Sequence, residues 1–266
     1  MKNYKHKTVE TSEFLKKHIK NPPQIGIITG TGLGKSSKSL NISVSFEYED
    51  IPHFPTSTVE SHYGRLLFGE IRGKQIMAMQ GRFHLYEGYS PLEVTFPIRV
   101  MQELGVKTLV LSNAAGGLNP GFNIGDIMII SDHINLTGSN PLIGPNEKDW
   151  GIRFPDMNAA YDKGMMDLAK KAGKDEGIRL QKGVFVGLKG PSLETPAEVR
   201  FLRSIGADAV AFSIIQEVIA AIHAGIKVLG LSTITNVHDP VEEIIAVAEK
   251  TAPKLEAIIN NVIEKN

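Results

Sequence analysis

Residues 80–89 read Gln-Gly-Arg-Phe-His-Leu-Tyr-Glu-Gly-Tyr and directly follow the apolar run Ile76–Met79, which predicts a buried strand. If the extended backbone continues past the first glycine, successive side chains alternate, so Arg82, His84 and Tyr86 share one face. A fixed cation beside an imidazole suits a phosphate-type anion, because guanidinium offers forked donors and histidine adds another. An edge strand with a solvated polar face is the alternative, and Arg-x-His-x-Tyr alone does not decide between the two.

A glycine-rich segment lies closer to the N-terminus, directly after another strand pattern. Residues 24–29 predict a buried strand and lead into Gly-Thr-Gly-Leu-Gly-Lys-Ser at 30–36. Backbone N–H groups in such a loop can cradle phosphate. The Walker A spacing fails, because only three residues separate Gly30 from Gly34, and the dinucleotide-binding pattern breaks at Lys35. A plain tight turn is therefore the alternative for this loop.

Strand and helix patterns alternate through the rest of the chain. Strands are predicted at 43–48, 65–71, 74–79, 107–112, 126–132, 183–188, 208–212 and 226–235, and helices at 8–20, 91–104 and 165–176. Three further helices begin with capping-box patterns at Thr195–Glu198, Ser213–Gln216 and Asp239–Glu242. Residues 113–119 predict a ligand-approach loop, and the Gly-, Pro- and Asn-rich segment 134–158 a binding or interface loop.

This alternation predicts an α/β fold with a mixed, mainly parallel twisted sheet flanked by helices. No repeat, linker or low-complexity tract divides the chain, so we expect one domain over residues 1–266. Its ends are predicted to be an N-terminal helix within 1–23 and a C-terminal helix within 239–266 packed on the domain.

The composition limits the partners of the chain. Its 29 Lys and Arg balance 29 Asp and Glu, so no net field favours nucleic acid or an anionic membrane. The absence of cysteine excludes disulfides, thiolate catalysis and cysteine metal sites. No apolar run approaches the ~18 residues of a membrane span, and no apolar signal region follows the basic N-terminus. We expect a soluble, cytoplasmic protein that binds neither nucleic acid nor membrane.

Six short segments follow one another in a specific order: Gly-Thr-Gly-Leu-Gly at 30–34, Ser-Thr-Val at 57–59 with His62, residues 80–89, Asn-Ala-Ala-Gly-Gly at 113–117, Gly-Pro-Ser-Leu-Glu-Thr at 190–195 and Thr-Asn at 235–236. The ordered set resembles the trimeric, inosine/guanosine-type purine nucleoside phosphorylases. The resemblance implies a phosphorylase fold and phosphate-dependent cleavage of 6-oxopurine (deoxy)nucleosides into free base and (deoxy)ribose 1-phosphate, a reaction of purine salvage.

On this resemblance, phosphate binds among Thr31, His62, Arg82, His84, the Ala114 backbone and Ser213. It implies no cofactor and no metal, because orthophosphate is a co-substrate and can itself stabilise the oxocarbenium-like ribose that it attacks. The catalytic residues would be His84, Glu194 and Asn236. Ser213 has a second explanation, since capping a helix would account for it alone.

The resemblance assigns the nucleoside to Tyr86, Ala114, Phe154, Leu193, Glu194, Phe212 and Asn236. Glu194 would accept from N1–H of the purine, and Asn236 would donate to O6 and accept from protonated N7. Phe154 would close the site of a neighbouring subunit, which implies a homotrimer. Two alternatives stay open: Glu194 could serve only the dipole of the following helix, and Asn236 could be a turn residue.

The chain also departs from the family pattern. Relatives commonly have Ser at the position of Thr31 and Met at that of Phe212. They carry a long loop after the position of Asn236, with a histidine near the ribose 5′-hydroxyl, whereas here two residues separate Asn236 from Asp239. His238 is a candidate for that contact. Two other functions therefore stay open, namely methylthioadenosine phosphorylase and a non-catalytic nucleoside- or phosphate-binding protein that lost its lid loop.

Overall fold

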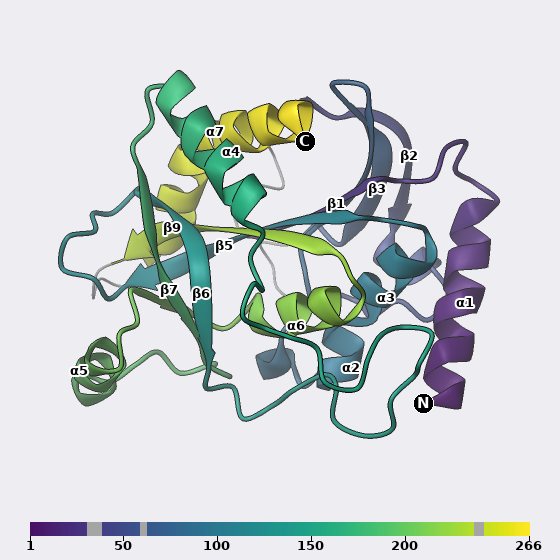
Figure 1. The fold of residues 1–266 in the computed structure, drawn as a ribbon, viewed down its shortest axis with the longest axis horizontal. Helices are drawn as coiled ribbons and strands as arrows, with labels where there is room; N and C mark the ends of the chain where they lie inside the picture. The colour runs from purple at the N-terminus through teal and green to yellow at the C-terminus, as the bar shows by residue number, and fades with distance from the viewer. Residues whose placement is uncertain (31–38, 59–62, 237–241) are drawn as a thin grey trace.

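The structure is a computed structural model, and it describes residues 1–30, 39–58, 63–236 and 242–266 (Figure 1). Strands of these residues form one mixed sheet, in the order β2-β3-β4-β1-β5-β8-β7-β6-β9 with a further β5–β9 pairing. The strands are β1 Ile25–Thr29, β2 Asn41–Glu47, β3 Arg65–Ile71, β4 Lys74–Gln80, β5 Thr108–Gly117, β6 Ile127–Asn135, β7 Leu180–Gly187, β8 Ala209–Ala211 and β9 Lys227–Asn236. The β5–β9 pairing joins the last five strands of this order into a closed ring.

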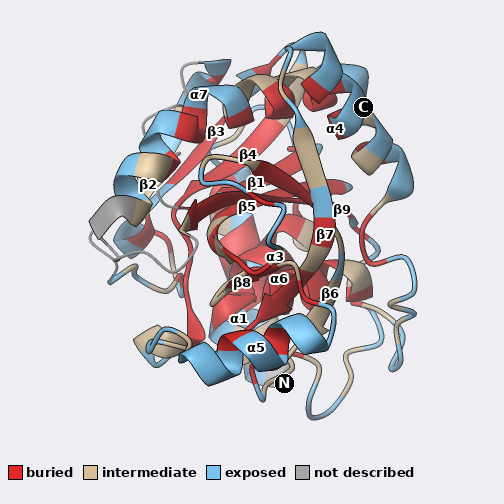
Figure 2. Ribbon diagram, turned by 90° about the vertical axis from the view of Figure 1, so that its left-hand side faces the viewer, coloured by how far each residue is buried: buried red, intermediate tan, exposed pale blue. Residues whose placement is uncertain are grey.

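Helices cover both faces of the sheet (Figures 1 and 2). They are α1 Lys2–Lys16, α2 Pro91–Val94, α3 Phe96–Glu103, α4 Lys163–Asp175, α5 Pro196–Ser204, α6 Ile215–His223 and α7 Glu242–Lys265, with 3-10 turns η2 Tyr48–Asp50 and η3 Leu85–Glu87. One face lies under α4 and α7, which pack on each other and on β9, and the other under α1, α3 and α6. Within the described residues, no helix has the length and apolar character needed to span a membrane.

The central strands bury both of their faces, which explains their continuous apolar runs. In β4, Ile76 belongs to the core beneath α4 and α7, whereas Met77 belongs to the core on the side of α1, α3 and α6. In β1, Ile27 belongs to the core beneath α4 and α7, and Ile28 belongs to the core on the other side. Figure 2 shows these strands as the buried centre of the molecule. The α/β class and the mixed, mainly parallel sheet predicted from the sequence are confirmed.

Three local predictions were wrong in their extent. Residues 113–117 do not form a loop, because they continue β5 as far as Gly117 and pair there with β8 and β9. The strand before residue 81 does not continue, because Gly81 bends the chain at φ +108° and η3 follows. The helix predicted over 91–104 is two helices that meet at Thr95, just before Pro97 in the first turn of α3, where a missing N–H is tolerated.

Candidate functional site

A cavity of about 340 Å³ opens where β1, β4, β5 and β9 end. These four strands are parallel neighbours, and the carboxyl ends of parallel strands are the usual place for a ligand in an open α/β sheet. The cavity brings together many of the residues singled out above: Arg82, His84, Tyr86, Ala114, Leu193, Glu194, Phe212, Ser213 and Asn236. Phe154 is 83% exposed and does not line it. Thr31, His62 and His238 lie outside the described residues.

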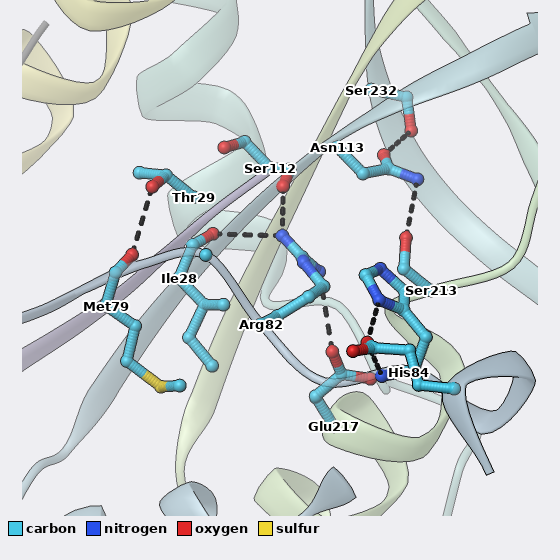
Figure 3. Close-up of polar contacts among 12 residues, drawn as sticks. Ile28, Thr29, Met79, Arg82, His84, Ser112, Asn113, Ser213, Glu217 and Ser232 are labelled. Atoms are coloured by element: carbon cyan, nitrogen blue, oxygen red, sulfur yellow. Dashed lines mark hydrogen bonds and ion pairs between the residues drawn. The ribbon is translucent and has the colours of Figure 1, made fainter. Parts of the chain in front are cut away.

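Arg82 supplies a buried cation at the inner wall of this cavity. Its side chain is 2% exposed, and its Nη1 lies 3.4 Å from Oε1 of Glu217, which is 3% exposed (Figure 3). Its Nη2 donates to the carbonyl oxygens of Ile28, at 3.2 Å, and Ser112. Burial lowers the pKa of Arg82, and the neighbouring Glu217 carboxylate opposes that shift. The alternative of a solvated edge strand is therefore wrong.

Glu217 is a site residue that the sequence analysis missed. It lies on α6, 135 residues from Arg82, in a helix whose other residues are mainly apolar and buried. The sequence did contain one local sign of this role, namely an acidic residue in a helix that is otherwise apolar. Buried acidic residues are rarely left without a partner, so such a residue indicates a buried ion pair. The pair holds the Arg82 guanidinium between the end of β1, the middle of β5 and the start of α6.

His84 is oriented by a carboxylate. Oε1 of Glu87 accepts from Nδ1 of His84 at 2.7 Å and from its backbone N–H at 2.8 Å. Oε2 accepts from the backbone N–H and the hydroxyl of Thr58, at 2.9 and 2.6 Å. Burial raises the pKa of Glu87, but the hydrogen bonds from His84 and Thr58 outweigh it and lower the pKa to about 2. The ionised carboxylate fixes the proton on Nδ1, as a partner carboxylate does for a catalytic imidazole.

Tyr86 completes this wall of the cavity. Its ring stacks on that of His84 at 4.6 Å between centroids, and meets Phe212 edge-on at 6.0 Å. Arg82, His84 and Tyr86 thus line the same cavity, as the alternation argument predicted. The three side chains are brought together by the bend at Gly81 and the turn η3, and not by a continuing strand as that argument assumed.

Ser213 does not cap α6, so the capping box predicted at Ser213–Gln216 was wrong. The N-cap residue is Ile214, with φ +75° and no side-chain cap bond. The N–H of Ile215 donates to the Ser213 carbonyl at 2.9 Å, which closes a γ-turn of the strained hand. The Ile214 side chain is fully buried and anchors this costly conformation. Such strain is typical of functional sites, where the surrounding structure enforces it.

Because Ser213 does not cap α6, its hydroxyl is able to take part in a chain of polar contacts. It accepts from Nδ2 of Asn113 at 3.2 Å, and the Asn113 carbonyl oxygen accepts from Ser232 at 2.7 Å (Figure 3). Asn113 is 4% exposed and Ser232 fully buried. This chain fixes Ser213 beside His84 and makes its hydroxyl hydrogen available to an anion in the cavity.

Glu194 and Asn236 lie at the other end of the cavity. The Thr235 hydroxyl lies 3.3 Å from the side-chain oxygen of Asn236 and 3.4 Å from the backbone oxygen of Ala115, and its single hydrogen serves one of the two. Donation to Asn236 directs the NH₂ group of that residue toward a ligand. The helix after Glu194 is capped by Thr195 and Glu198 in the predicted capping box. Glu194 takes no part in this cap, and it lines the cavity.

No group of three or more His, Asp or Glu side chains placed to hold a metal ion occurs among the described residues. The polar side chains that line the cavity are one guanidinium, one imidazole, one carboxylate, the carboxamides of Asn113 and Asn236, and the hydroxyls of Tyr86, Ser213 and Thr235. They suit an anion at one end and a polar ring with both donors and acceptors at the other.

Comparison with known proteins gives a consistent picture. The family description "Phosphorylase superfamily" matches residues 24–264. The chain is 55% identical to purine nucleoside phosphorylase 1 of Bacillus subtilis over 87% of this chain and 86% of that protein. It is 48% identical to purine nucleoside phosphorylase of Bos taurus, over 94% and 92% of the two chains. The structure of Schistosoma mansoni purine nucleoside phosphorylase with adenosine superposes with a TM-score of 0.93 at 40% identity, and covers 98% of this chain and 97% of that one. The structure with inosine superposes with the same TM-score at 38% identity, and covers 98% of this chain and 96% of that one.

Proposed function

The chain belongs to the phosphorylase superfamily and, within it, to the purine nucleoside phosphorylases, and on this premise we propose that its cavity cleaves inosine and guanosine, and their deoxy forms, with phosphate. The products are the free 6-oxopurine and (deoxy)ribose 1-phosphate, which places the reaction in purine salvage. The observation that carries this proposal is one cavity with a buried Arg82 at one end and the Glu194–Asn236 pair at the other.

At the phosphate end, Arg82, His84, Ser213 and the backbone at Ala114 hold the anion. An Arg–phosphate pair about 4 Å apart is worth roughly 4 kcal/mol per unit charge at an effective dielectric near 20. A phosphate oxygen attacks C1′ of the ribose as the bond from C1′ to N9 breaks, and the bonding electrons leave with the purine. The phosphate charge stabilises the oxocarbenium-like sugar that develops while this bond breaks. Thr31 and His62 complete this end in our proposal.

At the base end, negative charge builds on the purine as the bond breaks. Asn236 donates to O6 and accepts from N7 once that nitrogen is protonated, and Glu194 accepts from N1–H. These contacts stabilise the leaving base more than the bound substrate, which is the requirement for catalysis. Tyr86 and Phe212, which meet edge-on, pack on the ribose, and Leu193 covers the base.

We expect the purified protein to convert inosine and phosphate to hypoxanthine and ribose 1-phosphate in the presence of a metal chelator. The measurement is the release of hypoxanthine with and without phosphate, together with an assay of ribose 1-phosphate. Equal rates without phosphate would indicate hydrolysis and contradict the proposal, and so would a loss of activity on chelation that a divalent ion restores.

A second candidate substrate class is the 6-aminopurine nucleosides, including methylthioadenosine. The Schistosoma mansoni relative favours keeping this class, because one of its structures is a complex with adenosine. The carboxamide of Asn236 argues against this class, because methylthioadenosine phosphorylases typically carry Asp at that position. Rates with adenosine decide between the two classes.

The assembly that we propose is a homotrimer, as the resemblance implies. Its support is the segment between β6 and α4, where Ile143, Ile152 and Phe154 are 71%, 69% and 83% exposed. Apolar side chains gathered this way mark interaction sites on soluble proteins. Cytoplasmic location stays a prediction of the sequence.

Replacing Phe154 by alanine should raise the KM for inosine by roughly tenfold, because one buried aromatic contact with the nucleoside is worth about 1.5 kcal/mol or more. The KM for phosphate should change little, since the contact is with the nucleoside. Ile143→Ala is the matched control, being similarly exposed in the same segment. Sedimentation equilibrium should give a trimer for all three proteins, and a fully active parent monomer at micromolar concentration would refute the assembly.

A further inference from the structure

A second cavity, of about 460 Å³, adjoins the proposed active site and takes no part in the reaction described above. The two cavities share five lining residues, namely Gly116, Leu193, Glu194, Val210 and Asn236. Two of the five are the groups proposed to read the base. The edge of the purine that meets Glu194 and Asn236 therefore faces the second cavity.

The remaining wall of the second cavity combines apolar surface with two arginines. Leu118 and Val199 are buried and belong to one small apolar core. Arg200 and Arg203 line the cavity from α5, three positions apart and hence on one face of that helix. Nε of Arg203 donates to the Leu118 carbonyl at 2.6 Å, which ties that guanidinium to the wall. The lining of this cavity thus contains two guanidinium groups and one carboxylate, that of Glu194.

The chemistry of the base-reading pair limits which atom can carry a substituent into this space. A group on O6 would remove the proton on N1 and the acceptor at position 6, so both contacts would be lost. A group on the exocyclic amine of guanine leaves N1–H, O6 and one amine hydrogen in place. That amine also lies on the edge of the base that Glu194 reads.

Resting on the proposed function, we propose that the second cavity is a subsite for guanine nucleosides whose exocyclic amine carries a short alkyl chain ending in a carboxylate. The alkyl chain crosses between Glu194 and Gly116, which line both cavities, and lies against Leu118 and Val199. The carboxylate then meets Arg200 and Arg203, which offer the forked donors that suit it. The bonds made and broken are those of guanosine phosphorolysis, and the product is the N2-substituted guanine.

The test compares three substrates: guanosine, N2-(carboxymethyl)guanosine and N2-(carbamoylmethyl)guanosine. The last two differ in charge and hardly in size. We expect kcat/KM to be about fivefold higher for the carboxylate than for the amide, the effect of two partly exposed Arg–carboxylate contacts. The preference should shrink in 0.5 M KCl, because salt screens exposed charges.

Arg200→Gln and the double variant Arg200→Gln/Arg203→Gln should bring this ratio down toward one, with guanosine turnover unchanged. Arg200→Lys should keep part of the preference. An amide that reacts as well as the carboxylate in the parent would overturn the proposal, and so would a ratio that survives in the double variant.

Failure of the proposed function would show separately, as no phosphate-dependent cleavage of guanosine. In that case, calorimetry with N2-(carboxymethyl)guanine and N2-(carbamoylmethyl)guanine still tests the cavity without turnover. Tighter binding of the carboxylate to the parent, lost in the double variant, would support the subsite, and equal binding of the two bases would refute it.

Discussion

Arg82→Ala should raise the KM for phosphate by about a hundredfold, because a charge-assisted hydrogen bond is worth up to about 3 kcal/mol. It should also destabilise the fold. The substitution leaves the Glu217 carboxylate, 3% exposed, buried without its guanidinium partner. Breaking a buried ion pair in this way costs about 3–5 kcal/mol. Phosphate dependence of inosine turnover and urea unfolding measure the two effects.

A double variant separates these effects. Arg82→Leu/Glu217→Leu removes both charges at once, and replacing a buried pair by apolar side chains is often nearly neutral for stability. We expect its unfolding free energy to lie well above that of Arg82→Ala, while its KM for phosphate stays high. An unchanged phosphate KM in a folded Arg82 variant would mean that Arg82 has only a structural role, in which it links the end of β1 and the middle of β5 to α6.

We expect the second large effect in the preference of the enzyme for 6-oxopurine nucleosides over adenosine. Adenine reverses the donor and acceptor pattern that Glu194 and Asn236 read, so it leaves buried groups unpaired at about 1–3 kcal/mol each. We expect inosine and guanosine to exceed adenosine by at least about tenfold in kcat/KM. Asn236→Asp should shift this ratio toward adenosine, because a carboxylate accepts from the 6-amino group. Equal rates with inosine and adenosine on the parent would remove Asn236 from base recognition.

The contact from Thr235 supplies a matched control for this prediction. Its hydroxyl can donate to the side-chain oxygen of Asn236 or to the backbone oxygen of Ala115, and the first contact favours the orientation with NH₂ toward O6. Thr235→Val keeps the shape of the side chain and removes the hydroxyl. We expect a smaller loss of inosine preference than in Asn236→Asp, with stability nearly unchanged. A ratio that stays the same in the Asp variant would contradict the assigned role of the amide.

Much of this protein was determined by patterns short enough to read along the chain. Alternating apolar runs such as Ile76–Met79 determined which strands bury both faces, because side chains in a strand have a period of two. The capping box at Thr195–Glu198 determined the start of α5, because its bonds span three residues. The order of six motifs determined the family. Each of these signals lies within a few residues or in their sequence order.

Only the tertiary structure decided what those motifs do in detail. Glu217 meets Arg82 across 135 residues, and Asn113 meets Ser213 across 100, so neither pairing leaves a local pattern. The capping box expected at Ser213 failed because the buried Ile214 forces a γ-turn that the sequence alone favours little. Buried polar groups must find partners, and which partner is close depends on how the strands and helices pack. The same packing sets Arg200 and Arg203 beside the base-reading pair and creates the second cavity.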